Sequence, residues 1–118
     1  MISRQATFDM VVKHLRKQGR KAKCPVSGNC LYKAADGCTC PAGHLIPAEL
    51  YDPAFEGMPV LAVTRQRTAV GDLLVKLGHC TTIVHELQTI HDWFGPSSWE
   101  ARLAILAKKH KLTMPLKE

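Results

Sequence analysis

The sequence is poor in aromatic residues and lacks any long apolar run. Only 6% of its 118 residues are Phe, Trp or Tyr, so platforms for stacking nucleic-acid bases are scarce. No stretch approaches the roughly 18 consecutive apolar residues that a membrane helix needs, and residues 1–9 lack the apolar segment of a secretory signal. We therefore expect a cytoplasmic protein that does not associate with membranes.

Signatures of phosphate loops, disulfide frameworks and zinc knuckles are also missing. The glycines of the middle segment are isolated and form no P-loop or dinucleotide fingerprint. Five cysteines are an odd number, which fits reduced thiols better than a disulfide framework. The residues with zinc-ligand chemistry are Cys24, Cys30, Cys38, Cys40 and His44. The gaps between these cysteines differ from the paired spacing of structural zinc sites, so we expect no cofactor and keep zinc at this set as the alternative.

The chain has the size and composition of one small domain. With 46% hydrophobic residues, it has room for a single core, which we expect to span residues 1–118. An N-terminal helix is predicted over residues 3–18, with Ser3 as N-cap and Gly19 as the left-handed residue that ends it. Its apolar stripe consists of Phe8, Val11, Val12 and Leu15.

The second half of the chain also has helical periodicity. Apolar residues at helical spacing predict further helices within residues 68–111. The last of these helices carries the sequence S-x-x-E at Ser97 and Glu100. This pattern predicts a capping box, in which a hydroxyl and a carboxylate each satisfy a free backbone N–H group.

Between these helical regions, residues 28–59 predict a cysteine-bearing hairpin followed by a loop. A three-residue turn at residues 35–37 would pair Ala34 with Cys38 and Tyr32 with Cys40. In that register the side chains of Cys30, Tyr32, Cys38 and Cys40 share one face of the hairpin. The predicted fold class is therefore α+β and helix-rich, with about four helices and one short β-hairpin.

Charge is distributed unevenly along the chain, whose formal net charge is +6. From residue 10 to residue 35 there is no acidic residue, and the bases are Lys13, Arg16, Lys17, Arg20, Lys21, Lys23 and Lys33. From residue 34 to residue 64 the only charged residues are Asp36, Glu49, Asp52 and Glu56. The basic segment could bind nucleic acid or an acidic protein surface, and its cations form a separate face of the N-terminal helix.

Three pairs of residues have the composition of a catalytic or metal site. A nucleophilic thiol needs a base within hydrogen-bond reach, and a His-Asp pair in a metal-dependent hydrolase needs further ligands on other helices. No third orienting residue can be assigned to any of them. The pairs are Cys40 with His44, Cys80 with His79, and His91 with Asp92.

One string of residues carries a family resemblance. It consists of Gly28, Cys30, Tyr32, Lys33, Asp36, Gly37, Cys40, Gly43, Leu45, Ile46, Pro47, Tyr51, Asp52, Glu56 and Gly57. This string resembles an uncharacterised family of small phage and prophage proteins with the pattern C-x-Y-[KR]…DG-x-x-C-A-x-G-x-L-I-P-D-E-x-Y. The N-terminal helix is also similar to that family, so the resemblance covers about the first half of the chain. The chain departs from the pattern at Pro41 and Ala48, where the family tends to have Ala and Asp.

The resemblance implies a phage-type accessory protein in the cytoplasm of a bacterial host, without implying an activity. The first hypothesis is a non-enzymatic protein that binds and inhibits or sequesters a host component, in counter-defence or host takeover. Its target would be a host protein or a small signalling nucleotide. The second is a basic nucleic-acid-binding module, with or without zinc at the hairpin, and the third is a small hydrolase or thiol enzyme.

The sequence favours binding over catalysis and leaves the oligomeric state open. The candidate partner- or ligand-binding residues are the cations of the N-terminal helix and the charged or aromatic residues of the hairpin. They are Lys13, Arg16, Lys17, Arg20, Tyr32, Lys33 and Asp36.

Overall fold

A computed structural model describes residues 1–117 of the chain, and its regular structure in that range is helical. The five α-helices are α1 (Arg4–Gln18), α2 (Pro41–Leu45), α3 (Ala69–Lys76), α4 (Thr81–Trp93) and α5 (Pro96–His110). Two short 3₁₀ helices, η1 (Ala48–Leu50) and η2 (Pro53–Phe55), follow α2. None of the helices within residues 1–117 is long and apolar enough to span a bilayer.

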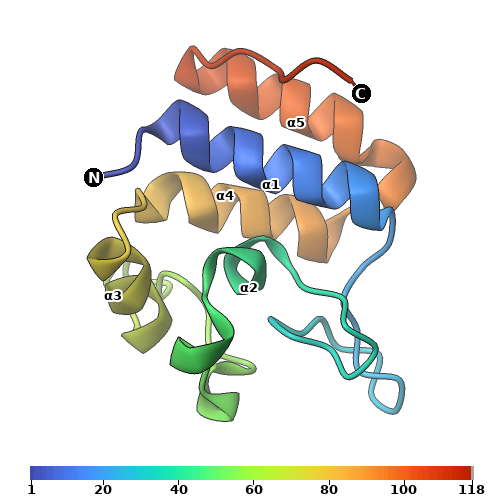
Figure 1. Ribbon diagram of the computed structural model, residues 1–118, viewed down its shortest axis with the longest axis vertical. Coiled ribbons are helices and arrows are strands. Elements are labelled where there is room, and N and C mark those ends of the chain that lie inside the picture. The colour runs from blue at the N-terminus through green and yellow to red at the C-terminus, as the bar shows by residue number, and fades with distance from the viewer. Residues whose placement is uncertain (118) are drawn as a thin grey trace.

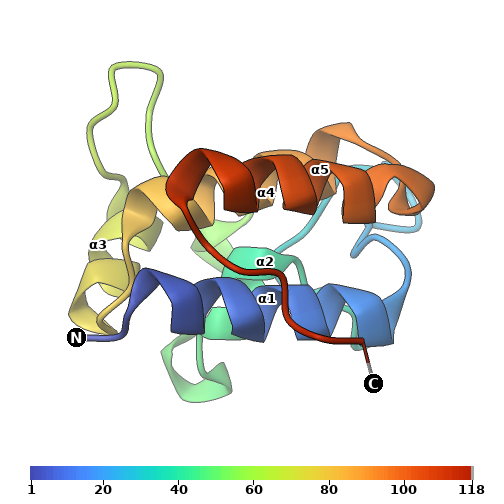
Figure 2. The ribbon, with the colours of Figure 1, turned by 90° about the horizontal axis from the view of Figure 1, so that it is seen from above.

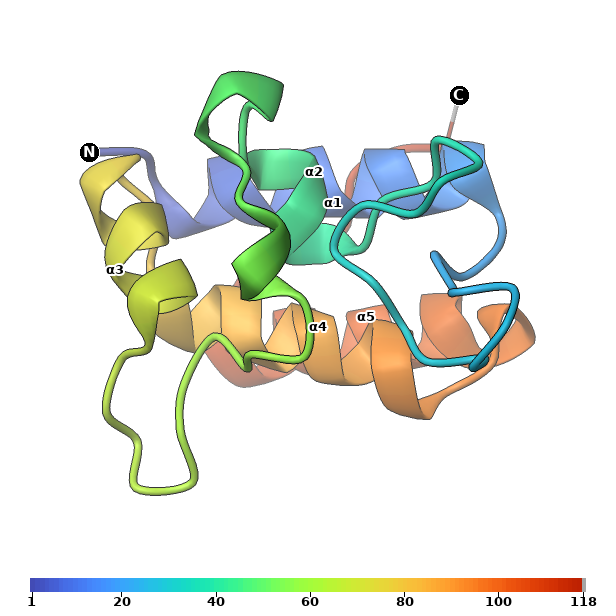
Figure 3. The ribbon, with the colours of Figure 1, turned by 90° about the horizontal axis from the view of Figure 1, so that it is seen from below.

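Helix α4 is the centre of the arrangement, because it packs against each of the other four α-helices. Helices α1, α4 and α5 lie roughly along one direction (Figure 1), and in the view of Figure 2 helix α5 overlaps α4 while α1 runs apart from both. Seen from below, α2 lies between α1 and α4, and α3 covers one end of α4 (Figure 3). One hydrophobic cluster contains residues from all five helices, including Phe8, Leu74, Leu87 and Leu103.

The first helix has the predicted bounds and caps. The Ser3 hydroxyl accepts a hydrogen bond from the backbone N–H of Ala6 at 3.0 Å, and Gly19 ends the helix with φ at 68°. That left-handed conformation is readily available to glycine. The stripe that the periodicity predicted is buried, since Phe8, Val11, Val12 and Leu15 are at most 1% exposed.

The predicted β-hairpin is wrong. Within residues 1–117 there is no β-strand, and the contacts at this place amount to isolated bridges, one of which joins Lys33 to Thr39. The turn itself exists, because the N–H of Ala34 donates to Cys38 O at 2.8 Å and the N–H of Cys40 donates to Tyr32 O at 3.2 Å. The ladder cannot extend, because the chain enters α2 directly after Cys40.

The predicted capping box at the start of α5 is also wrong. The helix begins at Pro96, with Gly95 as N-cap, and no side chain caps it. The Glu100 carboxylate pairs instead with Arg16 of α1, at 2.5 Å. The carboxylate that the local pattern assigned to the helix cap therefore forms a long-range ion pair instead.

Helix α2 packs closely against the backbone of Tyr32, and the residue of α2 at this contact is Gly43. A Cβ atom built on Gly43 would lie 1.9 Å from the backbone oxygen of Tyr32, far inside van der Waals contact. This close approach lets Tyr32 pack into the core, where it is 5% exposed. The packing of α2 on the turn therefore needs a residue without a side chain at position 43.

We expect Gly43→Ala to lower the free energy of unfolding by about 1–3 kcal/mol or more, because the clash is with backbone and cannot be relieved by a rotamer change. The matched control is Gly95→Ala, where an added Cβ meets nothing within 4 Å. Urea denaturation of both variants measures the difference. Equal stability of the two would contradict the close approach.

Candidate functional site

A hollow of about 1400 Å³ lies beside the cationic face of α1. Its walls come from α1, the turn at residues 36–38, α2, the first half of α5 and the segment after α5. We call this hollow the cationic groove. Its lining residues with charged or imidazole side chains are Lys13, His14, Arg16, Lys17, Arg20, Asp36, His44, Glu100 and Lys117.

The cationic groove has an excess of positive charge that its own acids do not neutralise. Its carboxylates are already paired: Asp36 lies 3.4 Å from Arg20, and Glu100 lies 2.5 Å from Arg16. Lys13 and Lys17 are exposed and form no ion pair within residues 1–117. They are four residues apart on α1, so their side chains lie on the same face of the helix.

Arg16 forms part of the wall between α1 and α5. Its Nε donates to Glu100 Oε1 at 2.5 Å and its Nη2 donates to Glu100 Oε2 at 3.2 Å. This two-point hydrogen bonding by Arg16 lowers the pKa of Glu100 and raises that of Arg16. The guanidinium is therefore held in place, and of the α1 cations it is Lys13 and Lys17 that can reach an outside anion.

Two histidines in the groove lie face to face. The rings of His14 and His44 are stacked, with centroids 4.0 Å apart and planes 6° from parallel. Burial lowers the pKa of both, and the neighbouring His14 and Lys33 help to lower that of His44 to about 4. At neutral pH the pair is uncharged, so it adds no further cations to the groove.

The three predicted binding residues of the hairpin, Tyr32, Lys33 and Asp36, form hydrogen bonds with different parts of the structure. The Tyr32 hydroxyl donates to Met58 O, and Lys33 Nζ donates to Gly43 O at 3.1 Å and Ile46 O at 2.9 Å, at the end of α2. Asp36 Oδ1 accepts from the N–H of Cys38 at 3.0 Å. Asp36 lies on the cationic groove with the α1 cations, whereas Tyr32 lines a smaller hollow beside α4.

The thiols do not gather on one face. Cys40 lies in the main core and is fully buried, whereas Cys38 belongs to a second small cluster with Ala22 and Ala34. Cys24 is partly exposed and belongs to neither of these clusters. The alternative zinc set of Cys24, Cys30, Cys38, Cys40 and His44 therefore has no common centre among the described residues.

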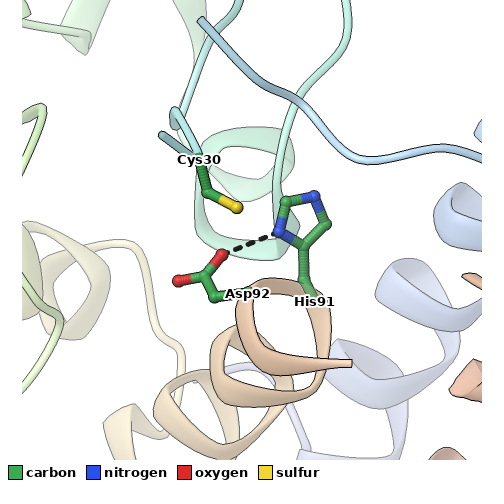
Figure 4. A group of neighbouring side chains, drawn as sticks. All are labelled: Cys30, His91 and Asp92. Carbon is green, nitrogen blue, oxygen red and sulfur yellow. Dashed lines mark hydrogen bonds and ion pairs between the residues drawn. The ribbon is translucent and has the colours of Figure 1, made fainter. Parts of the chain in front are cut away.

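A different group is brought together by the fold. One ligand atom each from Cys30, His91 and Asp92 lie within 4.8 Å of one another. Figure 4 shows the Cys30 sulfur directed toward the two α4 side chains. The sequence offered only the adjacent His91 and Asp92 as a signal, because Cys30 reaches them through the path of an irregular loop.

The positions of the protons in this group fit a set of structural hydrogen bonds better than a metal site. His91 is fully buried, and its Nε2 accepts from the N–H of Ala22 at 3.1 Å. The ring proton of neutral His91 must then lie on Nδ1, which donates to Asp92 Oδ1 at 2.8 Å. A metal ligand needs a free lone pair on that nitrogen, so in this tautomer the His91 ring is not available to a metal.

The Asp92 carboxylate accepts hydrogen bonds from two other side chains of α4, those of Gln88 and His91. Gln88 Nε2 donates to both of its carboxylate oxygens, at 3.1 and 3.3 Å, while Gln88 Oε1 accepts from the N–H of Ala42 at 3.1 Å. Burial and the nearby charge of Asp92 raise the pKa of Cys30. Together, the side chains of Gln88, His91 and Asp92 attach the backbone of Ala22 and Ala42 to α4, and we call these three residues the α4 clamp.

The geometry does not assemble a nucleophile at the predicted thiols. Burial raises the pKa of Cys40 to about 12, which keeps the thiol protonated. His79 is engaged elsewhere, because its Nδ1 forms a hydrogen bond of 2.7 Å with the hydroxyl of Thr7.

Removal of the carboxylate from the α4 clamp should destabilise the fold. We expect Asp92→Ala to cost about 1–3 kcal/mol, because the buried donor of His91 and the partly buried donor of Gln88 lose their acceptor. The control is Asp72→Ala, whose carboxylate forms an exposed pair with Arg67 at 3.2 Å and should cost less than about 1 kcal/mol. Urea denaturation compares them, and an equal loss in both variants would argue against the clamp.

Acid should weaken the fold through the stacked histidines. The pKa of folded His44 is about 4, against an ordinary value of 6.5. Between these two values the unfolded chain binds a proton that folded His44 does not, so the free energy of unfolding falls as pH is lowered through this window. His44→Gln should flatten that slope in denaturation curves recorded across the window, and an unchanged slope would assign the acid sensitivity to other groups.

Comparison of the chain with protein-family models, with curated proteins and with solved structures gives no match. The resemblance of the middle segment to phage proteins therefore stays a prediction. The role of the cationic groove has to be inferred from the side chains that line it and from the way in which they are paired.

Proposed function

We propose that this chain is a small, non-enzymatic accessory protein of the phage type, which binds and sequesters an anionic component of its host. The observation that supports this proposal is the cationic groove, where Lys13, Lys17 and Lys117 are not neutralised by the two acids of the lining. Positive side chains around a hollow attract and orient a negatively charged partner. Inhibition of the host component would follow from occupying its acidic surface.

The surroundings of the groove favour binding without chemistry. The histidines in the groove are stacked on each other and uncharged at neutral pH, and its one cysteine, Cys38, has a pKa raised by burial. A thiol nucleophile needs a lowered pKa and a base in reach. A hydrolase or thiol enzyme therefore finds little support in these residues.

Nucleic acid is the second candidate, because the same cations could follow a phosphate backbone. It is less well supported, since binding of single strands depends on exposed aromatic faces. The one Trp, Tyr or Phe among the groove's described lining residues is Trp99, which is 4% exposed. The exposed Trp93 belongs to the smaller hollow beside α4.

Charge reversal in the groove should abolish partner capture. We expect Lys13→Glu/Lys17→Glu to retain about tenfold less of any acidic component taken from a bacterial lysate than the unmodified chain does. Retention by the unmodified chain should weaken as salt rises. The measurement is quantitative mass spectrometry of what each immobilised protein retains.

The matched control is Lys76→Glu/Lys108→Glu, which makes the same charge change on exposed residues outside the groove. Circular dichroism and urea denaturation establish that both variants fold. Equal retention by the two variants and the unmodified chain would refute the role of the cationic groove.

A further inference from the structure

The segment after α5 forms a strap, which we define as residues 112–117, and the end of this strap lies in the cationic groove. It leaves the end of α5, turns back and crosses to α1 (Figure 2). The turn is made at Lys111, whose φ is 57°, and the N–H of Leu112 donates to Ala107 O at 2.8 Å. Leu116 and Lys117 line the cationic groove itself.

The strap is held mainly through its backbone. The Gln5 side chain forms hydrogen bonds with both backbone polar groups of Thr113. The N–H of Thr113 donates to Gln5 Oε1 at 2.9 Å, and Gln5 Nε2 donates to Thr113 O at 2.8 Å. Further along, Arg16 Nη1 donates to Pro115 O at 2.8 Å. These contacts recognise an extended peptide backbone in a fixed direction, and they do not depend on the side chains of the segment that is bound.

The side chains of the strap fit the groove less well than its backbone does. Leu112 and Met114 are partly buried against the core, but Leu116 is 90% exposed. The residues of the strap that line the groove, Leu116 and Lys117, bring no carboxylate to Lys13 and Lys17. An acidic segment on the same path would do so, and it would therefore be the better ligand.

We infer that the strap is a displaceable occupant of a peptide-binding groove, and that the partner is an extended acidic segment of another protein. The partner's backbone would pair with Gln5 and Arg16, and its carboxylates would pair with Lys13 and Lys17. The inference rests on the proposed function and narrows its anionic component to a polypeptide. Binding would exchange the backbone hydrogen bonds of the strap for those of the partner, and would release the partly buried side chains of Leu112 and Met114 from the core.

The direct test uses a fluorescein-labelled peptide that alternates Glu and Leu. Its binding to the full-length chain is measured by fluorescence anisotropy, with a peptide that alternates Gln and Leu as the uncharged control. We expect the acidic peptide to bind, and Lys13→Glu/Lys17→Glu to weaken it by about tenfold while Lys76→Glu/Lys108→Glu leaves it unchanged. Equal binding of both peptides would overturn the role of charge.

Displacement of the strap is followed at a single amide. The N–H of Thr113 is bonded to Gln5 in the free chain, so bound peptide should speed its hydrogen exchange in NMR spectra while core amides stay protected. Thr113→Pro removes that N–H group without touching the groove residues, and it should tighten peptide binding several-fold. Unchanged exchange at Thr113, or unchanged affinity of Thr113→Pro, would show that the strap does not compete.

A single-stranded thymidine oligonucleotide of similar charge separates this inference from the proposed function. If the oligonucleotide binds through Lys13 and Lys17 and the acidic peptide does not, the peptide inference falls and the anion-binding groove stands. If neither probe binds, the inference also falls. The proposed function falls only if capture from the lysate shows no dependence on the groove lysines.

Discussion

The fold depends on one requirement, that buried backbone N–H groups find acceptors although the middle of the chain forms no sheet. Side chains supply those acceptors. His91 accepts from Ala22 N–H and Gln88 accepts from Ala42 N–H. The Glu56 carboxylate accepts from the N–H groups of two consecutive residues of the turn, at 2.7 and 3.2 Å. An unsatisfied buried donor costs about 1–3 kcal/mol, so these polar side chains determine where the irregular segment can lie and, through it, one wall of the cationic groove.

Features of the fold set by neighbouring residues could be predicted from the sequence, and those set by distant partners could not. Ser3 and Gly19 bound α1 through contacts made within the helix, so the local pattern was sufficient. The capping box at Ser97 failed because Glu100 has a stronger partner in Arg16, which no local pattern contains. The hairpin failed for a related reason. Its turn formed, but helix α2 begins directly after Cys40 and leaves no residues for a longer ladder.

The candidate site also has features that depend on neighbouring residues and features that depend on distant partners. The basic face of α1 was visible in the sequence as a set of cations at helical spacing, yet the sequence could not say which of them are free. Tertiary contacts neutralise Arg16 and Arg20 and leave Lys13 and Lys17 available. The Cys30, His91 and Asp92 group could not be predicted, since it depends on the path of a loop without regular structure. Its chemistry is in turn decided by one further distant contact, the N–H of Ala22 on the His91 ring.

The proposed binding mode combines two kinds of recognition that respond differently to conditions. Backbone hydrogen bonds from Gln5 and Arg16 fix the path and direction of an extended segment, and they are nearly indifferent to salt and to sequence. Attraction by Lys13 and Lys17 depends on the charge of the segment and is screened over about 8 Å at physiological ionic strength. The chain's own strap, as far as the structure describes it, satisfies the first kind and offers no carboxylate for the second. In the proposed complex an acidic partner would satisfy both, so the lysines would provide the selectivity, and rising salt would shift the competition back toward the strap.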